Sequence, residues 1–167
     1  MNGLQKLNEL SSEEAAELFS KCCGASKWLN QMINSRPFVT NKEIAECSEK
    51  IWRTLDEKDW LEAFKQHPKI GDINSLRKKY SSTKKFAVKE QSGVNDASLE
   101  VLEELAKLNN EYEKKFGYIF IVCATGKTAE EMLSIIKERI RNDAKAEIKI
   151  AMEEQNKITK LRLEKLL

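Results

Sequence analysis

The sequence predicts an all-α fold: a single compact helical domain of about eight helices with one buried extended segment. Two observations favour this fold class. Apolar residues recur three and four positions apart along most of the chain, and several of these stretches begin at a good helix-capping residue. A chain of 167 residues can bury roughly 70% of its unfolded surface in one core. Since no linker-like composition divides it, we expect one domain over residues 1–167.

Capping residues, glycine and proline delimit the first three predicted helices. The first runs from about residue 12 to residue 22 and ends before Gly24. The second covers residues 26–33, ahead of Pro37. The third begins after Thr40, a good N-cap residue. Its apolar side chains follow at helical spacing, at Ile44, Cys47, Ile51 and Leu55.

The fourth predicted helix, residues 59–66, leads to the only histidine of the chain, His67. The apolar residues in helical register with this histidine, which should make it point inward, are Trp60, Ala63 and Phe64. Pro68 has no amide hydrogen and disfavours helical conformation in the preceding residue, so the helix should stop at about Gln66. The negative helix end would favour the protonated imidazole. His67 is therefore a candidate acid-base group, and the alternative is a core histidine that only ends a helix.

A polar stretch and a long helix follow. Residues 71–93 lose the apolar period and are rich in Lys, Ser and Thr, so we expect a loop with short helical turns. Irregular stretches of this length are often functional. A helix over residues 98–116 should come next, with Gly117 as its stop. Asn109 lies on the apolar stripe of this helix, where core residues are expected.

Residues 118–124 form a continuous apolar run, which predicts a lone buried extended segment. Without a partner strand its backbone amides and carbonyls need other partners, which makes it a natural surface for a hydrogen-bonding ligand. Thr128 and Glu131 then form a capping box for a helix in which Arg139 lies on the apolar face. The last helix should cover residues 144–166. One side of it is predicted to carry Glu147, Ala151, Glu154, Ile158 and Leu161.

The composition excludes several classes of function. With 29 Lys and Arg against 27 Asp and Glu, the net charge is only +2, and basic runs lack interleaved aromatic residues, so we expect no nucleic-acid partner. Four cysteines without C-x-x-C spacing and a single histidine do not make a usual zinc ligand set, so we expect no metal. The scattered cysteines suit a reducing compartment. Without a signal-like N-terminus or a long apolar stretch, a cytoplasmic protein with no membrane association is expected.

Three polar side chains on apolar stripes, His67, Asn109 and Arg139, need an explanation, because burying an unpaired charge or amide is costly. Internal pairing is one account: Arg139 would pair with Glu147 or Glu154, and Asn109 would hold loop backbone. The other account is function. Convergence of these groups with a loop carboxylate, in a chain without metal or nucleotide motif, suits cofactor-independent proton transfer on a small polar anion.

Residues spread over nearly the whole chain form one ordered pattern. Before the histidine it includes Cys23, Gly24, Ser26, Trp28, Arg36, Pro37, Phe38, Asp59, Trp60, Leu61, Ala63 and Phe64. It continues with His67, Pro68, Ile70, Gly71, Asp72, Glu90, Gln91, Ser92 and Gly93. It ends with Leu108, Asn109, Tyr112, Lys115, Phe116, Gly117, Phe120, Ile121, Gly126, Arg139, Glu147, Ile158, Arg162 and Leu163. In this order and spacing the chain resembles the 2-oxo-4-hydroxy-4-carboxy-5-ureidoimidazoline (OHCU) decarboxylases of purine degradation, which form (S)-allantoin.

The resemblance implies an all-helical carboxy-lyase that needs no cofactor, acts on a small-molecule ureidoimidazoline and forms a homodimer. It implies that His67 is the catalytic acid-base residue and that Glu90 and Arg139 are the other catalytic residues. The substrate-binding residues that it implies are Pro68, Ala87, Val88, Lys89, Glu90, Gln91, Ile119, Phe120, Ile121, Val122 and Cys123. Many members of the family carry serine where this chain has Ala87, so that hydroxyl contact is missing or is supplied elsewhere.

The expected chemistry needs no external electron sink. Loss of carbon dioxide leaves an electron pair that can delocalise into the unsaturated ring of the substrate itself, so the protein has to supply orientation, hydrogen-bond donors and a proton on one face. Two alternatives stay open from the sequence. One is a non-catalytic helical interaction module whose inward polar residues only hold helices together. The other is an enzyme of the same fold that acts on a different small ureide, which would explain Ala87.

Overall fold

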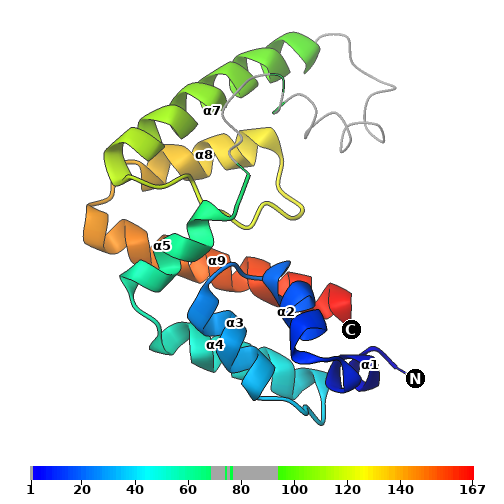
Figure 1. Cartoon of the computed structure of the whole chain (residues 1–167). Helices are drawn as coiled ribbons and strands as arrows, with labels where there is room; N and C mark the ends of the chain where they lie inside the picture. The colour runs from blue at the N-terminus through cyan, green and yellow to red at the C-terminus, as the bar shows by residue number, and fades with distance from the viewer. Residues whose placement is uncertain (1, 69–73, 75, 77–93) are drawn as a thin grey trace. The chain divides into compact units, whose positions relative to one another are not determined.

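A computed structural model describes residues 2–68, 74, 76 and 94–167 of the chain (Figure 1). These residues contain eight α-helices and no β-strand, so the predicted all-α class is confirmed for the described part of the chain. In chain order the helices are α1 (Gly3–Glu9), α2 (Ser12–Ser20), α3 (Ser26–Asn34), α4 (Asn41–Thr54), α5 (Glu57–Lys65), α7 (Val94–Phe116), α8 (Ala129–Arg139) and α9 (Ala144–Leu166).

Backbone contacts group the chain into two compact units. Unit 1 comprises Met1–His67, Ile121–Cys123 and Ile148–Leu167, and unit 2 comprises Pro68–Phe120 and Ala124–Glu147. The sequence-based expectation of one domain over the whole chain stays a prediction. Each unit has its own buried side chains, and they are described separately below.

Local capping signals explain most helix boundaries. The hydroxyl of Ser11 accepts the backbone N–H of Glu14 at 3.2 Å and the Glu14 carboxylate accepts that of Ser11 at 2.9 Å, so α2 begins where the sequence predicts. The predicted capping box of Thr128 at the start of α8 is also confirmed. The short helix α1 was not predicted, although Asn2 caps it in the same way.

In unit 1 the core is rich in aromatic residues. Trp28 of α3 is fully buried and meets Phe19 of α2 edge to face, with 6.0 Å between ring centroids. The indole N–H of Trp28 donates to the hydroxyl of Ser48 in α4 at 3.1 Å, which satisfies the polar atoms of both buried side chains. Phe64 of α5 is also fully buried, one turn before His67. Helix α5 is thus anchored in this core.

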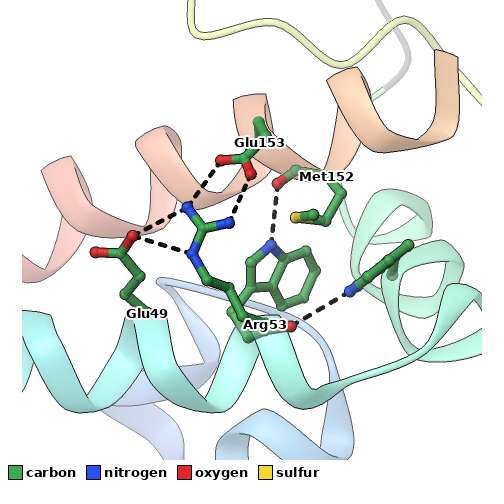
Figure 2. A network of polar contacts seen from close by, with 6 residues as sticks. Glu49, Arg53, Met152 and Glu153 are labelled. Carbon is green, nitrogen blue, oxygen red and sulfur yellow. Dashed lines mark hydrogen bonds and ion pairs between the residues drawn. The ribbon is translucent and has the colours of Figure 1, made fainter. Parts of the chain in front are cut away.

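Polar contacts join α4 to α9 within unit 1 (Figure 2). Arg53 donates to Glu153 at 2.7 Å and to Glu49 at 3.0 Å. The indole N–H of Trp52 donates to the carbonyl oxygen of Met152 at 3.0 Å. The Arg53 ion pairs are about half exposed and contribute little. Buried Trp52 contributes more by removing its large apolar surface from water, and it holds α9 beside α4.

Unit 2 contains α7 and α8, which pack against each other. The ammonium group of Lys115 donates to the carbonyl oxygens of Ile140 at 2.5 Å and Asn142 at 3.1 Å, so the C-terminal ends of the two helices lie together. Gly117 has a positive φ of 82°, which confirms it as the stop of α7. Helix α7 begins at Val94, a turn earlier than the predicted residue 98.

The buried line of α9 differs from the predicted one. The residues along it that are buried four positions apart are Glu147, Ala151, Gln155, Thr159 and Leu163. The prediction of Glu147 and Ala151 is confirmed, whereas Glu154, Ile158 and Leu161 are only half-buried. The sequence-based prediction used the spacing of apolar residues and therefore did not include Gln155 and Thr159. Both side chains are polar, and the Gln155 amide donates to the Thr159 hydroxyl at 3.1 Å, which satisfies these buried polar groups.

Candidate functional site

His67 lies directly after the C-cap of α5. Asp56 and Asp59 form a capping box at the start of this helix, and Gln66 is its C-cap, so the predicted stop ahead of Pro68 is confirmed. The backbone N–H of His67 still donates to the carbonyl oxygen of Phe64 at 3.2 Å. Because Phe64 is fully buried, the helix end is tied to the core, and the imidazole is half-buried at its edge. Pro68 itself is exposed.

The imidazole of His67 contacts a buried amide on α9. Nε2 of His67 is hydrogen-bonded to Oε1 of Gln155. The Gln155 side chain is 1% exposed, and its amide nitrogen donates to the hydroxyl of Thr159, which is also buried. Gln155 and Thr159 were not among the sequence-predicted site residues. The signal that could have found them is their spacing of four from Ala151 along α9.

Burial lowers the pKa of His67 below its usual value of 6.5, because the charged imidazolium is penalised away from water. The hydrogen bond to Gln155 acts in the opposite direction, and the positive charge of Arg162 lowers the pKa further. The net shift is therefore opposite to the one expected from the helix end alone, because burial and the charge of Arg162 lower the pKa. A neutral imidazole dominates at pH 7.

The buried segment that the sequence predicts as extended lies between α7 and α8. Residues 119–123 are neither helix nor strand, and the side chains of Ile121 and Cys123 are buried. The backbone N–H of Cys123 donates to Oε2 of Glu154 at 2.8 Å, so one backbone group of the segment is satisfied by a carboxylate of α9. Ile119, Phe120 and Val122 are half-buried.

Arg139, the last residue of α8, is buried in unit 2 together with a carboxylate. Its Nε and Nη2 atoms both lie 2.7 Å from Oε1 of Glu147, which is fully buried. The sequence left Glu147 and Glu154 open as partners, and the structure selects Glu147. The phenol of Tyr112 donates to the same Oε1 atom at 2.5 Å, and Asn142 donates to Oε2 at 3.0 Å. The guanidinium also lies over the ring of Phe120, 4.7 Å from its centroid.

Burial is the main cause that raises the pKa of Tyr112, and its hydrogen bond to Glu147 adds to the effect. The phenol therefore stays protonated and donates. Removing one member of a buried ion pair costs about 3–5 kcal/mol, since the other charge is left uncompensated. The cluster around Glu147 thus fixes the guanidinium of Arg139 in one orientation beside Phe120, a predicted substrate-binding residue.

Asn109 is half-buried on α7, and its amide nitrogen donates to the carbonyl oxygen of Leu105 in the same helix at 3.0 Å. The loop whose backbone it was predicted to hold lies outside the described residues, apart from Asn74 and buried Leu76. Five predicted site residues lie outside them too: Ala87, Val88, Lys89, Glu90 and Gln91.

The contacts of the described site residues join two predicted residues in one case, Arg139 and Phe120, and otherwise join a predicted residue to an unpredicted one. In unit 1, His67 contacts Gln155, and Cys123 contacts Glu154. In unit 2, Arg139 contacts Phe120. Among the described residues, no group of three or more His, Cys, Asp or Glu side chains is placed to hold a metal ion. Within the same part of the chain, none of the helices combines the length and apolar character that a membrane span requires.

Comparison with known proteins gives consistent matches. The chain is 39% identical over 158 residues to the uric acid degradation bifunctional protein TTL of Arabidopsis thaliana. The aligned region covers 94% of this chain and 48% of the relative. It is 25% identical over 170 residues to the OHCU decarboxylase of Amia calva. The aligned region covers 98% of this chain and 94% of the relative. The chain spans about half of the Arabidopsis relative and about a third of two bifunctional relatives from Bacillus.

A solved structure agrees with the sequence matches. The crystal structure of an OHCU decarboxylase in the presence of (S)-allantoin superposes with a TM-score of 0.71 and 37% identity, and covers 94% of this chain and 98% of the other. The family model of OHCU decarboxylase matches residues 8–164. Because this match includes nearly the whole sequence, the chain belongs to the OHCU decarboxylase family.

Proposed function

We propose that the chain converts OHCU to (S)-allantoin in urate degradation, as a carboxy-lyase that uses no cofactor. The observation that carries the proposal is the likeness, at 37% identity over 94% of this chain, to an OHCU decarboxylase crystallised in the presence of (S)-allantoin. The match of the family model over residues 8–164 supports it.

The reaction requires the protein to move protons and does not require a cofactor that accepts electrons. When carbon dioxide leaves, the electron pair of the broken bond forms a double bond to the neighbouring ring carbon, and the electrons of the adjacent C=N bond pass to its nitrogen, which takes up a proton. The resulting enol then loses its hydroxyl proton and gains a proton at the ring carbon. Delivery to one face of that carbon yields a single enantiomer.

In this proposal His67 moves the proton between the hydroxyl group and the ring carbon. Its lowered pKa supports the role, since a neutral imidazole accepts a proton and the imidazolium then formed gives it up more readily than an ordinary imidazolium. Arg139 would bind the carboxylate or ureido group by charge-assisted hydrogen bonds, with Glu147 holding the guanidinium. Glu90 would polarise His67 or the substrate hydroxyl.

The remaining contacts are proposed from the resemblance. Pro68, the stretch from Ala87 to Gln91 and the backbone of residues 119–123 would bind the substrate. Part of this proposal is supported by residues 119–123, which are neither helix nor strand and include the buried side chains of Ile121 and Cys123.

We also propose that the chain acts in the cytoplasm as a homodimer. Four free cysteines support a reducing compartment. The dimer follows only from the family resemblance, and light scattering on the purified protein tests it. A monomeric mass at the concentration of the activity assay would remove it.

The proposed function is tested with substrate that is generated in the assay itself. OHCU is generated from urate by the upstream enzymes, and the appearance of optically active allantoin is followed with and without this protein. We expect (S)-allantoin to form faster than by spontaneous decay, and His67→Asn to abolish the acceleration. If the wild-type protein gives no acceleration, the interaction-module or different-ureide alternative replaces this proposal.

A further inference from the structure

A line of buried neutral groups leads from His67 into unit 1. Nε2 of His67 contacts Oε1 of Gln155, and Nε2 of Gln155 donates to the Thr159 hydroxyl at 3.1 Å. The Thr159 hydroxyl in turn lies within hydrogen-bonding reach of the Cys23 sulfur. Gln155, Thr159 and Cys23 are each 3% exposed or less, so water does not compete for these contacts. The line has a direction, because an amide has distinct donor and acceptor ends.

That direction determines which nitrogen of His67 carries the proton. The Thr159 hydroxyl accepts from the amide nitrogen of Gln155 and can donate to the Cys23 sulfur, so the amide oxygen of Gln155 faces the imidazole. An amide oxygen only accepts hydrogen bonds. Nε2 of His67 must therefore carry its hydrogen, and in the neutral imidazole the basic lone pair lies on Nδ1.

We propose that Gln155 is a positioning residue that holds His67 as the Nε2–H tautomer, with Thr159 orienting the Gln155 amide, so that Nδ1 is the nitrogen that takes and gives the proton. The catalytic meaning of this assignment rests on the proposed function, but the tautomer does not. Among the described residues, the charged group that acts on His67 is Arg162 on α9. Gln155 is uncharged, so it orients the ring without adding a charge that would hold the imidazolium.

The tautomer can be read without substrate. His67 is the only histidine of the 167 residues, so ¹⁵N-histidine labelling gives ring signals from one residue. Above the pKa of His67 we expect a long-range ¹H–¹⁵N spectrum with Nε2 protonated and Nδ1 not. A dominant Nδ1–H form would overturn the proposal, because it would mean that the Gln155 amide is reversed. This reading stands whether or not the protein decarboxylates OHCU.

Two substitutions of Gln155 should move the pKa of His67 in opposite directions. Gln155→Met keeps the side-chain volume and removes the acceptor. The Nδ1–H form of His67 should then become populated, and the pKa of His67 should fall further. We expect kcat to drop about 10- to 100-fold, with KM changed less than twofold. Gln155→Glu keeps an acceptor oxygen and adds a negative charge, so it should retain the Nε2–H tautomer and raise the pKa by about 1 to 3. The acidic limb of the pH–rate profile should move to lower pH in Gln155→Met and to higher pH in Gln155→Glu.

A purely structural Gln155 would give different results. Both substitutions would then reduce thermal stability without opposite pKa shifts, and Gln155→Met would keep the wild-type tautomer and kcat, which would overturn the proposal. Gln31→Met, at an exposed glutamine of α3, is the matched control and should match wild type in all readouts. Thr159→Val tests the second link: it removes the acceptor of the Gln155 amide, so the Nδ1–H form should appear although Gln155 is present. An unchanged spectrum of Thr159→Val would remove Thr159 from the proposal.

Discussion

His67 and Arg139 solve the problem of a polar group on an apolar helix face in two different ways. His67 meets a neutral amide, so its charge stays variable and burial sets its pKa. Arg139 meets the fully buried carboxylate of Glu147, so its orientation is fixed. The first arrangement suits a group that exchanges protons, and the second suits a group that binds an anion.

His67→Asn should reduce kcat by about a hundredfold or more, the usual scale for a positioned acid-base group. Asparagine can still donate to Gln155, so the melting temperature should change little. Steady-state kinetics and thermal melts on the same preparations check both parts. A large loss of stability with full specific activity would make His67 a structural residue.

The lowered pKa of His67 predicts a pH dependence of stability. The folded pKa lies below the unfolded value of 6.5, so between these two values the unfolded chain binds more protons than the folded chain. The stabilising contribution is fully present above pH 6.5 and is lost as the pH falls through the folded pKa. Urea titrations should show that the free energy of unfolding of wild type falls over this window relative to His67→Asn. Parallel curves for the two proteins would contradict the shift.

Arg139→Lys replaces a planar fork by a point charge of the same sign. Lysine cannot reproduce both the Nε and Nη2 contacts to Glu147, so we expect KM for OHCU to rise about tenfold or more and the protein to lose about 1–3 kcal/mol of stability. Arg53→Lys is the control, because Arg53 pairs with Glu153 and Glu49 in an exposed position and should change neither quantity measurably. Unchanged KM with reduced stability would leave Arg139 as a purely structural partner of Glu147.

Among the helices, those with capping residues could be predicted well from the sequence. Thr40 and Thr128 cap their helices as expected, and Gly117 ends α7 with a positive φ. Local backbone chemistry decides such boundaries, so a short window of sequence is enough. Helix α1 was missed although it has a capping box, because its seven residues carry little apolar periodicity.

Of the partners of the inward polar groups, Glu147 was one of two candidates for Arg139, whereas Gln155 and Tyr112 were not predicted. Gln155 is 88 positions from His67, and Tyr112 is 35 positions from Glu147. Such contacts depend on how helices pack, which the spacing within one helix does not contain. The direction of the His67 pKa shift was missed for the same reason, since burial of the imidazole by other elements lowers the pKa.

The end of α5 offers a test of how tightly the position of His67 is set. A Cβ added at Gly24 would lie 2.1 Å from Cγ and 2.7 Å from Cβ of Gln66, the residue before His67. Gly24→Ala should therefore cost about 1–3 kcal/mol of stability by overpacking. It should also shift the ring signals of His67 and lower kcat several-fold.

Gln66→Gly is the matched change, because it removes both clashing atoms at a C-cap position that tolerates glycine. In the Gly24→Ala background it should restore stability and kcat toward wild type, a coupling that a double-mutant cycle measures. Additive effects of the two substitutions would mean that Gly24 acts independently of the helix end.

For the molecule as a whole, the family match covers residues 8–164 and so includes both units and the part of the chain that the structure does not describe. A ligand that binds the folded chain and not the unfolded one should stabilise it against unfolding.

The product of the proposed reaction tests such stabilisation directly. A ligand that binds only the folded chain adds about 2.7 kcal/mol at a hundred times its Kd. In a protein of this size each kcal/mol raises the melting temperature by about 2–4 °C. Saturating (S)-allantoin should therefore raise the melting temperature by roughly 5–10 °C.

The (R) enantiomer is the control and should raise the melting temperature less, because groups fixed as firmly as Arg139 present donors in one arrangement. Arg139→Lys should reduce the shift with (S)-allantoin. Equal shifts for both enantiomers would contradict a stereospecific site, and equal shifts for wild type and Arg139→Lys would remove Arg139 from it.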